Sequence, residues 1–255
     1  MTVSGKLAGK VAIVTGGGSG FGAGIVKKFV LEGAQVVVAD IQQDAVSKTA
    51  DQYPSTQVVA LQADVSSEAD WKRVLDLTLK KFGGLDIVVN NAGVVNNACP
   101  SIDTDEASLD RLLRVNVKSL YHSTKTTIPY FLENKRPAVF VNVSSISAAR
   151  PRPGLVWYAA SKAALTTASR ALAVEWAPHG IRFNIIQPAL GETAMAASLN
   201  AGPDSPDGRA KALETIPLGR LSTPEDIGNT AAWLASDEAT MLTGATIDVD
   251  GGRGI

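Results

Sequence analysis

The sequence predicts an α/β fold in which one parallel sheet is covered by helices on both faces. Short runs rich in β-branched residues alternate with longer segments of helical periodicity. The short runs are apolar at successive positions, as in strands that are buried on both faces. Seven such strands and six helices, with no compositional break in 255 residues, predict a single doubly wound domain over residues 1–255.

The elements follow one another in strict alternation. The first strand runs into glycines, the second ends at an aspartate, and the later ones end at polar residues or proline; we expect them at Val11–Thr15, Val36–Ala39, Val58–Gln62, Ile87–Asn90, Val139–Val143, Arg182–Ile186 and Thr246–Val249. The intervening segments are long enough for helices, which we expect at Gly24–Glu32, Asp44–Gln52, Glu68–Phe82, Glu106–Phe131, Trp157–Trp176 and Pro224–Ala235. A (β/α)8 barrel is the main alternative, but it requires an eighth unit and gives no reason for the glycines after the first strand.

One segment, Leu190–Ile216, breaks this alternation. It is polar and carries several helix-breaking residues, namely Gly191, Gly202, Pro203, Pro206 and Gly208. An irregular insertion of this length in a compact domain usually acts as a lid or binding loop. We therefore expect a substrate-binding loop at about residues 190–216.

Composition limits the possible partners and location. A net charge of −1 and a pI near 6.1 argue against nucleic acid or an anionic membrane as the main partner. Cys99 is the only cysteine, and His122 and His179 are far from it in sequence, so no zinc site and no metal is expected. The first apolar run is too short for a signal peptide, and no run approaches the ~20 residues that span a bilayer. We expect a soluble, cytoplasmic protein.

A glycine-rich turn follows the first strand. Thr15–Gly22 reads Thr-Gly-Gly-Gly-Ser-Gly-Phe-Gly and opens the first helix. Glycines allow backbone N–H groups to approach a pyrophosphate closely, and the helix N-terminus adds partial positive charge. Such turns can be purely structural, but the strand–turn–helix context favours a dinucleotide site.

The second strand ends at Asp40. A carboxylate there can accept hydrogen bonds from the adenosine ribose hydroxyls, whereas it repels a 2′-phosphate. Neither Ile41 nor the glycine turn supplies a basic residue to neutralise such a phosphate. The sequence therefore predicts NAD(H) rather than NADP(H), the alternative being a strand-end aspartate that caps a turn.

Tyr158 and Lys162 are four residues apart, with Ser145 thirteen residues before the tyrosine. On a helix, this spacing places a phenol and an ammonium side by side. Lowering a tyrosine pKa from ~10 to ~7 requires about 4 kcal/mol, and one opposite charge at ~4 Å supplies roughly that much at an effective dielectric of ~20. The pair is a candidate acid/base, although the same spacing also occurs on ordinary amphipathic helices.

Together these motifs resemble the short-chain dehydrogenase/reductase family, a Rossmann-type fold of about 250 residues, from Lys10 to Gly252. The glycine turn matches the family's T-G-x-x-x-G-x-G, Asn90–Gly93 matches its N-N-A-G, and Asp64-Val65 matches its acidic pair at the adenine. The resemblance implies an NAD cofactor bound by Gly16, Ser19, Gly20, Phe21, Gly22, Asp40, Ile41, Asp64, Val65, Asn90, Ala92, Gly93, Tyr158, Lys162, Pro188, Leu190, Gly191 and Thr193.

The resemblance also implies a catalytic tetrad of Asn116, Ser145, Tyr158 and Lys162. Tyr158 would be the general acid/base, and Lys162 would lower its pKa and hold the nicotinamide ribose. Ser145 would donate to the substrate oxygen, with Ser144 as the neighbouring candidate. Asn116, in a long helix, would hold a water that links Lys162 to solvent, or would simply be a polar residue that kinks the helix.

Family members usually have Pro-Gly after the sixth strand, where this chain has Pro188-Ala189. A positive φ would strain alanine by roughly 1 kcal/mol or more. We therefore expect an ordinary φ at Ala189.

The resemblance implies a small alcohol or ketone as substrate and a homotetramer built through the helices at residues 106–131 and 157–176. We expect the substrate site to include Val95, Asn97, Arg152, Trp157, Glu192 and Met195. Arg150 and Arg152 can bind a carboxylate or phosphate, or can be solvated or lie at a subunit contact. Two alternatives are an NADPH-preferring 3-oxoacyl-type ketoreductase and a non-catalytic NAD-binding regulator.

Overall fold

The computed structural model describes residues 5–193, 195–198 and 206–255. Within these ranges, parallel strands form one seven-stranded sheet in the order β3-β2-β1-β4-β5-β6-β7. The strands are β1 (Val11–Thr15), β2 (Gln35–Asp40), β3 (Val58–Gln62), β4 (Ile87–Asn90), β5 (Ala138–Val143), β6 (Ile181–Pro188) and β7 (Thr246–Val249). The chain winds outward from β1 to β3, then returns to β4 and winds the other way, which confirms the predicted doubly wound sheet.

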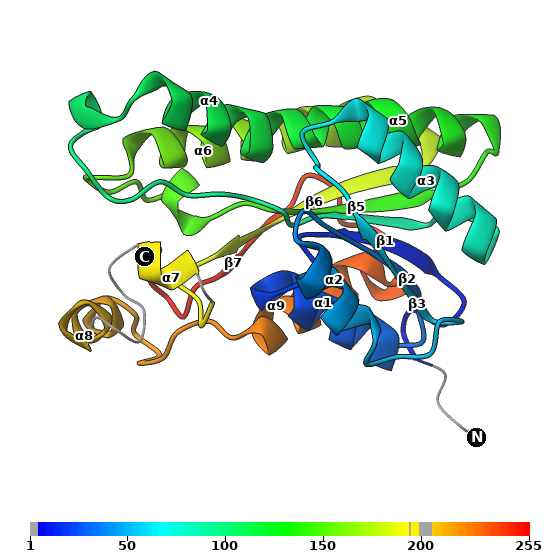
Figure 1. Cartoon of the computed structure of the whole chain (residues 1–255), viewed down its shortest axis with the longest axis horizontal. Helices are drawn as coiled ribbons and strands as arrows, with labels where there is room; N and C mark the ends of the chain where they lie inside the picture. The colour runs from blue at the N-terminus through cyan, green and yellow to red at the C-terminus, as the bar shows by residue number, and fades with distance from the viewer. Residues whose placement is uncertain (1–4, 194, 199–205) are drawn as a thin grey trace.

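Helices cover both faces of this sheet (Figure 1). One face carries α1 (Gly20–Leu31), α2 (Gln43–Ala50) and α9 (Pro224–Ala235). The other carries α3 (Glu68–Phe82), α4 (Glu106–Leu113), α5 (Ser119–Glu133) and α6 (Val156–Trp176). Two further helices, α7 (Met195–Ser198) and α8 (Pro206–Glu214), lie beyond one end of the sheet.

Alternating side chains of each strand feed two cores, one on each face. In β2, Val36 and Val38 pack with the apolar residues of α1, α2 and α9. Val37 and Ala39 pack with those of α3, α5 and α6. This alternation explains why the strands are apolar at successive positions, because each side chain enters one core or the other.

Two predictions about the helices need correction. The predicted helix 106–131 is interrupted by a π-helical turn, Arg114–Lys118, between α4 and α5. The segment 190–216 was expected to be irregular, but its described residues include α7 and α8. Residues 194 and 199–205 of that segment lie outside the described residues. Pro206 begins α8 and Gly208 lies inside it, so residues that suggest a loop stand within a helix here.

The parallel topology brings all carboxyl ends of the strands to one edge. The glycine turn follows β1, Asp40 ends β2, and the loops after β4, β5 and β6 leave from the same edge. Open parallel sheets bind ligands at this edge, where the winding direction reverses between β1 and β4. Among the described residues, no helix is both long and apolar enough to cross a membrane.

Candidate active site

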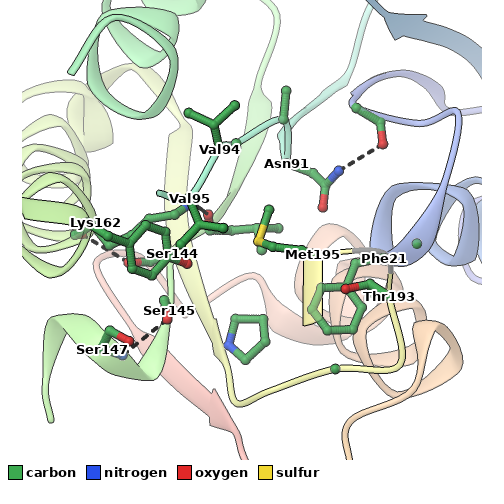
Figure 2. Close-up of a pocket in the computed structure, with 18 of the residues that line it drawn as sticks. Phe21, Asn91, Val94, Val95, Ser144, Ser145, Ser147, Lys162, Thr193 and Met195 are labelled. Carbon is green, nitrogen blue, oxygen red and sulfur yellow. Dashed lines mark hydrogen bonds between the residues drawn. The ribbon is translucent and has the colours of Figure 1, made fainter. Parts of the chain in front are cut away.

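A cavity of about 740 Å³ opens at the carboxyl edge of the sheet. Figure 2 shows Lys162, Ser144 and Ser145 on one side of it and Phe21 and Thr193 on the other, with Met195 between them. The cavity wall includes most of the residues that the sequence predicts: Gly16, Ser19, Gly20, Phe21, Gly22, Asp40, Ile41, Asp64, Val65, Ala92, Gly93, Ser145, Tyr158, Lys162, Pro188, Leu190, Gly191 and Thr193.

The glycine turn is packed too tightly for larger residues. A Cβ on Gly22 would lie 2.0 Å from the carbonyl oxygen of Gly16, and Gly16 itself has a φ of +63°. At the N-terminus of α1, Ser19 makes no side-chain capping hydrogen bond, and the first turn has no acidic residue. The backbone N–H groups and the helix dipole therefore remain available for an anion, which fits the pyrophosphate of a dinucleotide.

Asp40 is held in place by its own loop. Its carboxylate accepts hydrogen bonds from the backbone N–H groups of Gly18 at 3.0 Å and Gln42 at 3.1 Å. A Cβ on Gly18 would lie 3.0 Å from that carboxylate, so the glycine permits the close approach. The next residue, Ile41, is 60% exposed at the rim of the cavity. This arrangement fits an adenosine ribose beside a fixed carboxylate.

Thr15 connects the residues that follow β4 to the glycine turn. Its hydroxyl oxygen accepts hydrogen bonds from the N–H groups of Asn91 at 3.1 Å and Ala92 at 3.2 Å. The predicted cofactor residue Asn90 does not line the cavity, because its side chain donates to Asn142 on the neighbouring strand at 2.9 Å. Asn91 lines it instead, and its amide donates to the carbonyls of Thr15 and Gly16. The residue after the predicted one therefore forms the wall here, because successive side chains along a strand point to opposite faces, and the role of Asn90 toward a cofactor stays a prediction.

Tyr158 lies in the first turn of α6 and is 7% exposed. Burial raises the pKa of its phenol, while the neighbouring Ser145 hydroxyl and the charge of Arg152 act in the opposite direction. Lys162 does not contribute to this shift, so the lowering of the pKa of Tyr158 by Lys162 stays a prediction.

Lys162 lies one helical turn further along α6 and is 4% exposed. Its ammonium donates a hydrogen bond to the carbonyl of Val143 at 3.0 Å, at the end of β5. Burial lowers the pKa of Lys162 from 10.5 to about 8. A Cβ on Gly93 would lie 3.1 Å from its Nζ atom, so the glycine makes room for the ammonium.

The structure distinguishes the two candidate serines. The hydroxyl of Ser144 donates to the carbonyl of Lys162 at 3.0 Å and lies 2.8 Å from the hydroxyl of Thr166, so it ties β5 to α6. The hydroxyl of Ser145 accepts a hydrogen bond from the N–H of Ser147 at 3.1 Å, and it lies close enough to the phenol of Tyr158 to act on its pKa. Ser145 is therefore placed to contact a substrate oxygen.

Asn116 lies behind the cavity wall, fully buried in the π-helical turn. Its amide accepts from the N–H of Val94 at 2.8 Å and donates to the carbonyl of Val94 at 2.9 Å and to Ser161 at 3.0 Å. These bonds use both amide N–H groups and one lone pair of the amide oxygen, so a water that links to Lys162 would bond to the other lone pair or to a main-chain group. A π-helical turn disturbs the usual i→i+4 bonding and frees such a group.

Ala189 adopts an ordinary backbone conformation, as expected. Among the described residues, Lys135 is the only non-glycine residue with a positive φ. The following Gly191 packs against the ring of Phe21, where a Cβ would lie 2.1 Å from the ring. The β6 loop therefore meets the glycine turn without requiring glycine at position 189.

The predicted substrate residues divide into two groups. Val95, Arg152 and Met195 line the cavity. Three others lie outside it. Asn97 is exposed, and Trp157 points away on α6 and donates to the carbonyl of Ser101 at 3.1 Å.

The third, Glu192, is exposed and forms an ion pair with Arg209 at 2.8 Å. Helical geometry explains Trp157, because consecutive helix residues point about 100° apart and Tyr158 faces the cavity. Residues that sequence reasoning did not assign also line the wall: Arg111, Arg114, Val115, Ile146, Ser147 and Arg253.

Comparison with known proteins supports the assignment. A family model described as enoyl-(acyl carrier protein) reductase matches residues 16–253. 4-Formylbenzenesulfonate dehydrogenase of Comamonas testosteroni is 43% identical, over 96% of this chain and 98% of that protein. The chain belongs to the short-chain dehydrogenase/reductase family.

Two further members show how closely the fold and sequence agree. 3β-Hydroxysteroid dehydrogenase 1 of Eggerthella lenta is 37% identical, over 96% of this chain and 94% of that protein. The crystal structure of a 3-ketoacyl-(acyl-carrier-protein) reductase from Brucella melitensis, complexed with NADH, is 40% identical with a TM-score of 0.91, and covers 98% of this chain and all of that one.

Membership of the short-chain dehydrogenase/reductase family makes the chain an oxidoreductase that acts on CH–OH groups with a nicotinamide cofactor. Among the residues that the structure describes, no three His, Cys, Asp or Glu side chains are grouped to hold a metal ion.

Proposed function

We propose that the chain transfers a hydride between NAD(H) and a secondary alcohol or ketone, with Tyr158 as general acid/base. The observation that carries the proposal is that one cavity contains both the glycine turn and the Ser145–Tyr158–Lys162 group. A dinucleotide bound to the turn would reach the tyrosine without leaving this cavity. The cofactor, when bound, supplies hydride transfer at its nicotinamide ring.

The side chains divide the remaining work. In alcohol oxidation, the phenolate of Tyr158 takes the hydroxyl proton as the carbinol hydrogen leaves as hydride. Ser145 donates a hydrogen bond to the substrate oxygen and so orients it. The buried ammonium of Lys162 stabilises the phenolate, and the positive charge of the oxidised cofactor adds to this effect. In ketone reduction the protonated phenol returns the proton.

The main test is turnover of secondary alcohols and ketones, followed at 340 nm with both NAD(H) and NADP(H). Tyr158→Phe should lower kcat by at least ~10²-fold, since it removes the acid/base. NADH binding, measured by fluorescence titration, should be retained. A Tyr158→Phe variant that turns over at close to the wild-type rate contradicts the mechanism.

The preference for NAD(H) rests on Asp40 and on the absence of a basic residue at Ile41. Asp40→Ala should raise the kcat/KM ratio of NADP(H) to NAD(H), and adding Ile41→Arg should raise it further, because the carboxylate repels a 2′-phosphate. The two single-cofactor kcat/KM values provide the measurement. Wild-type protein that already prefers NADPH contradicts the Asp40 argument.

Similar proteins support the class of reaction but name different substrates, among them a formylbenzenesulfonate, a hydroxysteroid and a 3-ketoacyl carrier protein. The last of these keeps a 3-oxoacyl-type ketoreductase as the alternative function. The crystal structure of that reductase contains NADH, which supports NAD(H) for this chain as well. Reduction of a 3-oxoacyl thioester faster than any simple ketone would favour the alternative.

A further inference from the structure

Basic side chains outnumber acidic ones on the cavity wall. Five arginines line the cavity: Arg111, Arg114, Arg150, Arg152 and Arg253. Among the described residues, the acidic residues on the wall are Asp40 and Asp64, at the ends of β2 and β3. Arg152 follows β5 and Arg253 follows β7, in the opposite half of the sheet. The cavity is thus negative on its nucleotide side and positive where β5 and β7 end.

Three of these arginines converge from two distant segments. Arg150 donates through Nη1 to the main-chain carbonyl of Arg253 and, at 3.4 Å, to the oxygen of Ile255. This contact holds the segment after β7 against the loop after β5. The pKa of Arg253 is lowered because its guanidinium is half-buried and because the charges of Arg152 and Arg150 lie close to it.

The acidic side chain nearest to this cluster is hydrogen-bonded to the main chain. Asp250 opposes the shift at Arg253, but its carboxylate oxygens accept hydrogen bonds from the N–H groups of Gly252 at 2.9 Å and Gly254 at 2.6 Å. Asp248 lies beside Asp250 rather than among the groups that act on Arg253, and burial and the charge of Asp250 raise the pKa of its carboxyl. Within the described ranges, no ion pair of 4.0 Å or less joins Arg150, Arg152 or Arg253 to an acidic side chain.

The cluster lies close to the reacting groups. Arg152 is near enough to Tyr158 for its charge to lower the pKa of the phenol. Apolar side chains, Val95, Leu155 and Met195, also line the cavity, beside the polar groups of Ser145 and Lys162. Guanidinium groups bind carboxylates and sulfonates through paired N–H donors, and an anion there would offset their mutual repulsion.

We propose that Arg152 and Arg253 bind an anionic group of the substrate, so that the substrate is an alcohol or ketone that also carries a carboxylate or sulfonate. Arg150 positions Arg253 by holding its main chain. The proposal rests on the oxidoreductase function proposed above and names its substrate class.

The test measures binding of matched ketones by isothermal titration calorimetry, with and without NADH. The anionic probes are 4-acetylbenzoate and 4-acetylbenzenesulfonate, and the neutral probe is 4-acetylbenzamide. Both anions should bind at least about 10-fold more tightly than the amide, as hydrogen bonds between charged groups predict. Equal affinities, or no binding of either anion, overturn the proposal; tighter binding of one anion alone assigns the subsite to that group.

Variants identify the groups responsible. Arg152→Leu and Arg253→Leu should each remove most of the difference between anion and amide, while Arg152→Lys should retain part of it. Arg73→Gln provides the control, because Arg73 is exposed, pairs with Asp70 and does not line the cavity. Circular dichroism checks that each variant is folded. If both leucine variants fold and still prefer the anions, the assignment is overturned.

Failure of this proposal is distinguishable from failure of the proposed function. If the anions bind but no alcohol or ketone is turned over, the anion site at Arg152 and Arg253 is supported and the proposed oxidoreductase reaction is rejected. Turnover of 4-acetylbenzamide as efficient as that of both anions, with no difference in binding, leaves the reaction standing and rejects the subsite.

Discussion

Lys162 is a charged group in a place that disfavours charge. It is 4% exposed, and its pKa is lowered from 10.5 to about 8 because burial penalises the ammonium. Its Nζ atom has the carbonyl of Val143 as a hydrogen-bond acceptor, and Gly93 leaves room for it. The protein thus keeps a cation beside Tyr158 at a cost in folding stability, as is common at active sites.

The cost of burying the Lys162 ammonium predicts that Lys162→Met will stabilise the protein. The difference between 10.5 and about 8 corresponds to roughly 3 kcal/mol, and loss of the hydrogen bond to Val143 returns about 1 kcal/mol. The free energy of unfolding of the variant should therefore be about 2 kcal/mol higher than that of the wild type at pH 7, as measured by urea denaturation. The variant should also lose most of its activity.

The pH dependence of that gain has a definite sign. Below pH 8 the lysine is charged in both folded and unfolded chains, so the burial cost is fully present. Between pH 8 and 10.5 the unfolded chain binds more protons, so wild-type stability relative to the variant rises with pH. The gain from Lys162→Met should shrink across this window. A gain that is constant or that grows with pH contradicts the interpretation.

At the scale of elements, the π-helical turn Arg114–Lys118 fixes the loop after β4 to α6. Asn116 bonds both main-chain groups of Val94 and also Ser161, which lies on α6 between Tyr158 and Lys162. Val94 lines the cavity directly. One buried amide therefore connects three elements that shape the reacting end of the site.

Asn116→Leu should destabilise the protein by about 2–5 kcal/mol, because it leaves several buried polar groups without partners. We expect a lower Tm and a fall in kcat, measured by thermal denaturation and steady-state kinetics. Asn134→Ala is the matched control, since Asn134 is exposed at the end of α5 and should change stability by less than about 0.5 kcal/mol. Equal effects of the two substitutions would reject the connecting role of Asn116.

The sequence predicted the strands well and the helices less well. All seven strands match the predictions closely, because β-branched runs that end at polar or glycine residues are unambiguous in a parallel sheet. The π-helical turn was not predictable, since one extra residue in a hydrogen-bonded turn hardly changes the hydrophobic period. In the segment 190–216, the Gly and Pro residues that suggest a loop also occur at helix ends, as Pro206 does at the start of α8.

The candidate site was predicted wherever a motif is continuous in sequence. The glycine turn and the Tyr158–Lys162 pair lie where their spacing indicates. Arg253 was missed because its approach to Arg150 joins positions 103 residues apart, which only the strand order reveals. Asn90 and Trp157 were each assigned one position away from the side chain that faces the cavity, a difference that depends on register rather than composition.

For the whole molecule, we propose a homotetramer assembled through α5 and α6. Apolar and aromatic side chains are exposed on these helices, with Val174 80% and Tyr121 54% exposed. Multi-angle light scattering should give a mass near four times the 26.6 kDa subunit. A mass close to one subunit at micromolar concentration contradicts the assembly.

The contact between Arg150 and the C-terminal segment has a practical consequence for anyone who produces the protein. Figure 1 shows the C-terminus beside α7, and Arg253 lines the cavity, whereas Gly5 lies against Glu32 at the end of α1. An affinity tag fused after Ile255 would begin beside the hydrogen bonds that Arg150 donates to the main-chain oxygens of Arg253 and Ile255. It would disturb these bonds and so displace Arg253. Kinetic constants for charged compounds should therefore be taken from amino-terminally tagged or tag-free protein.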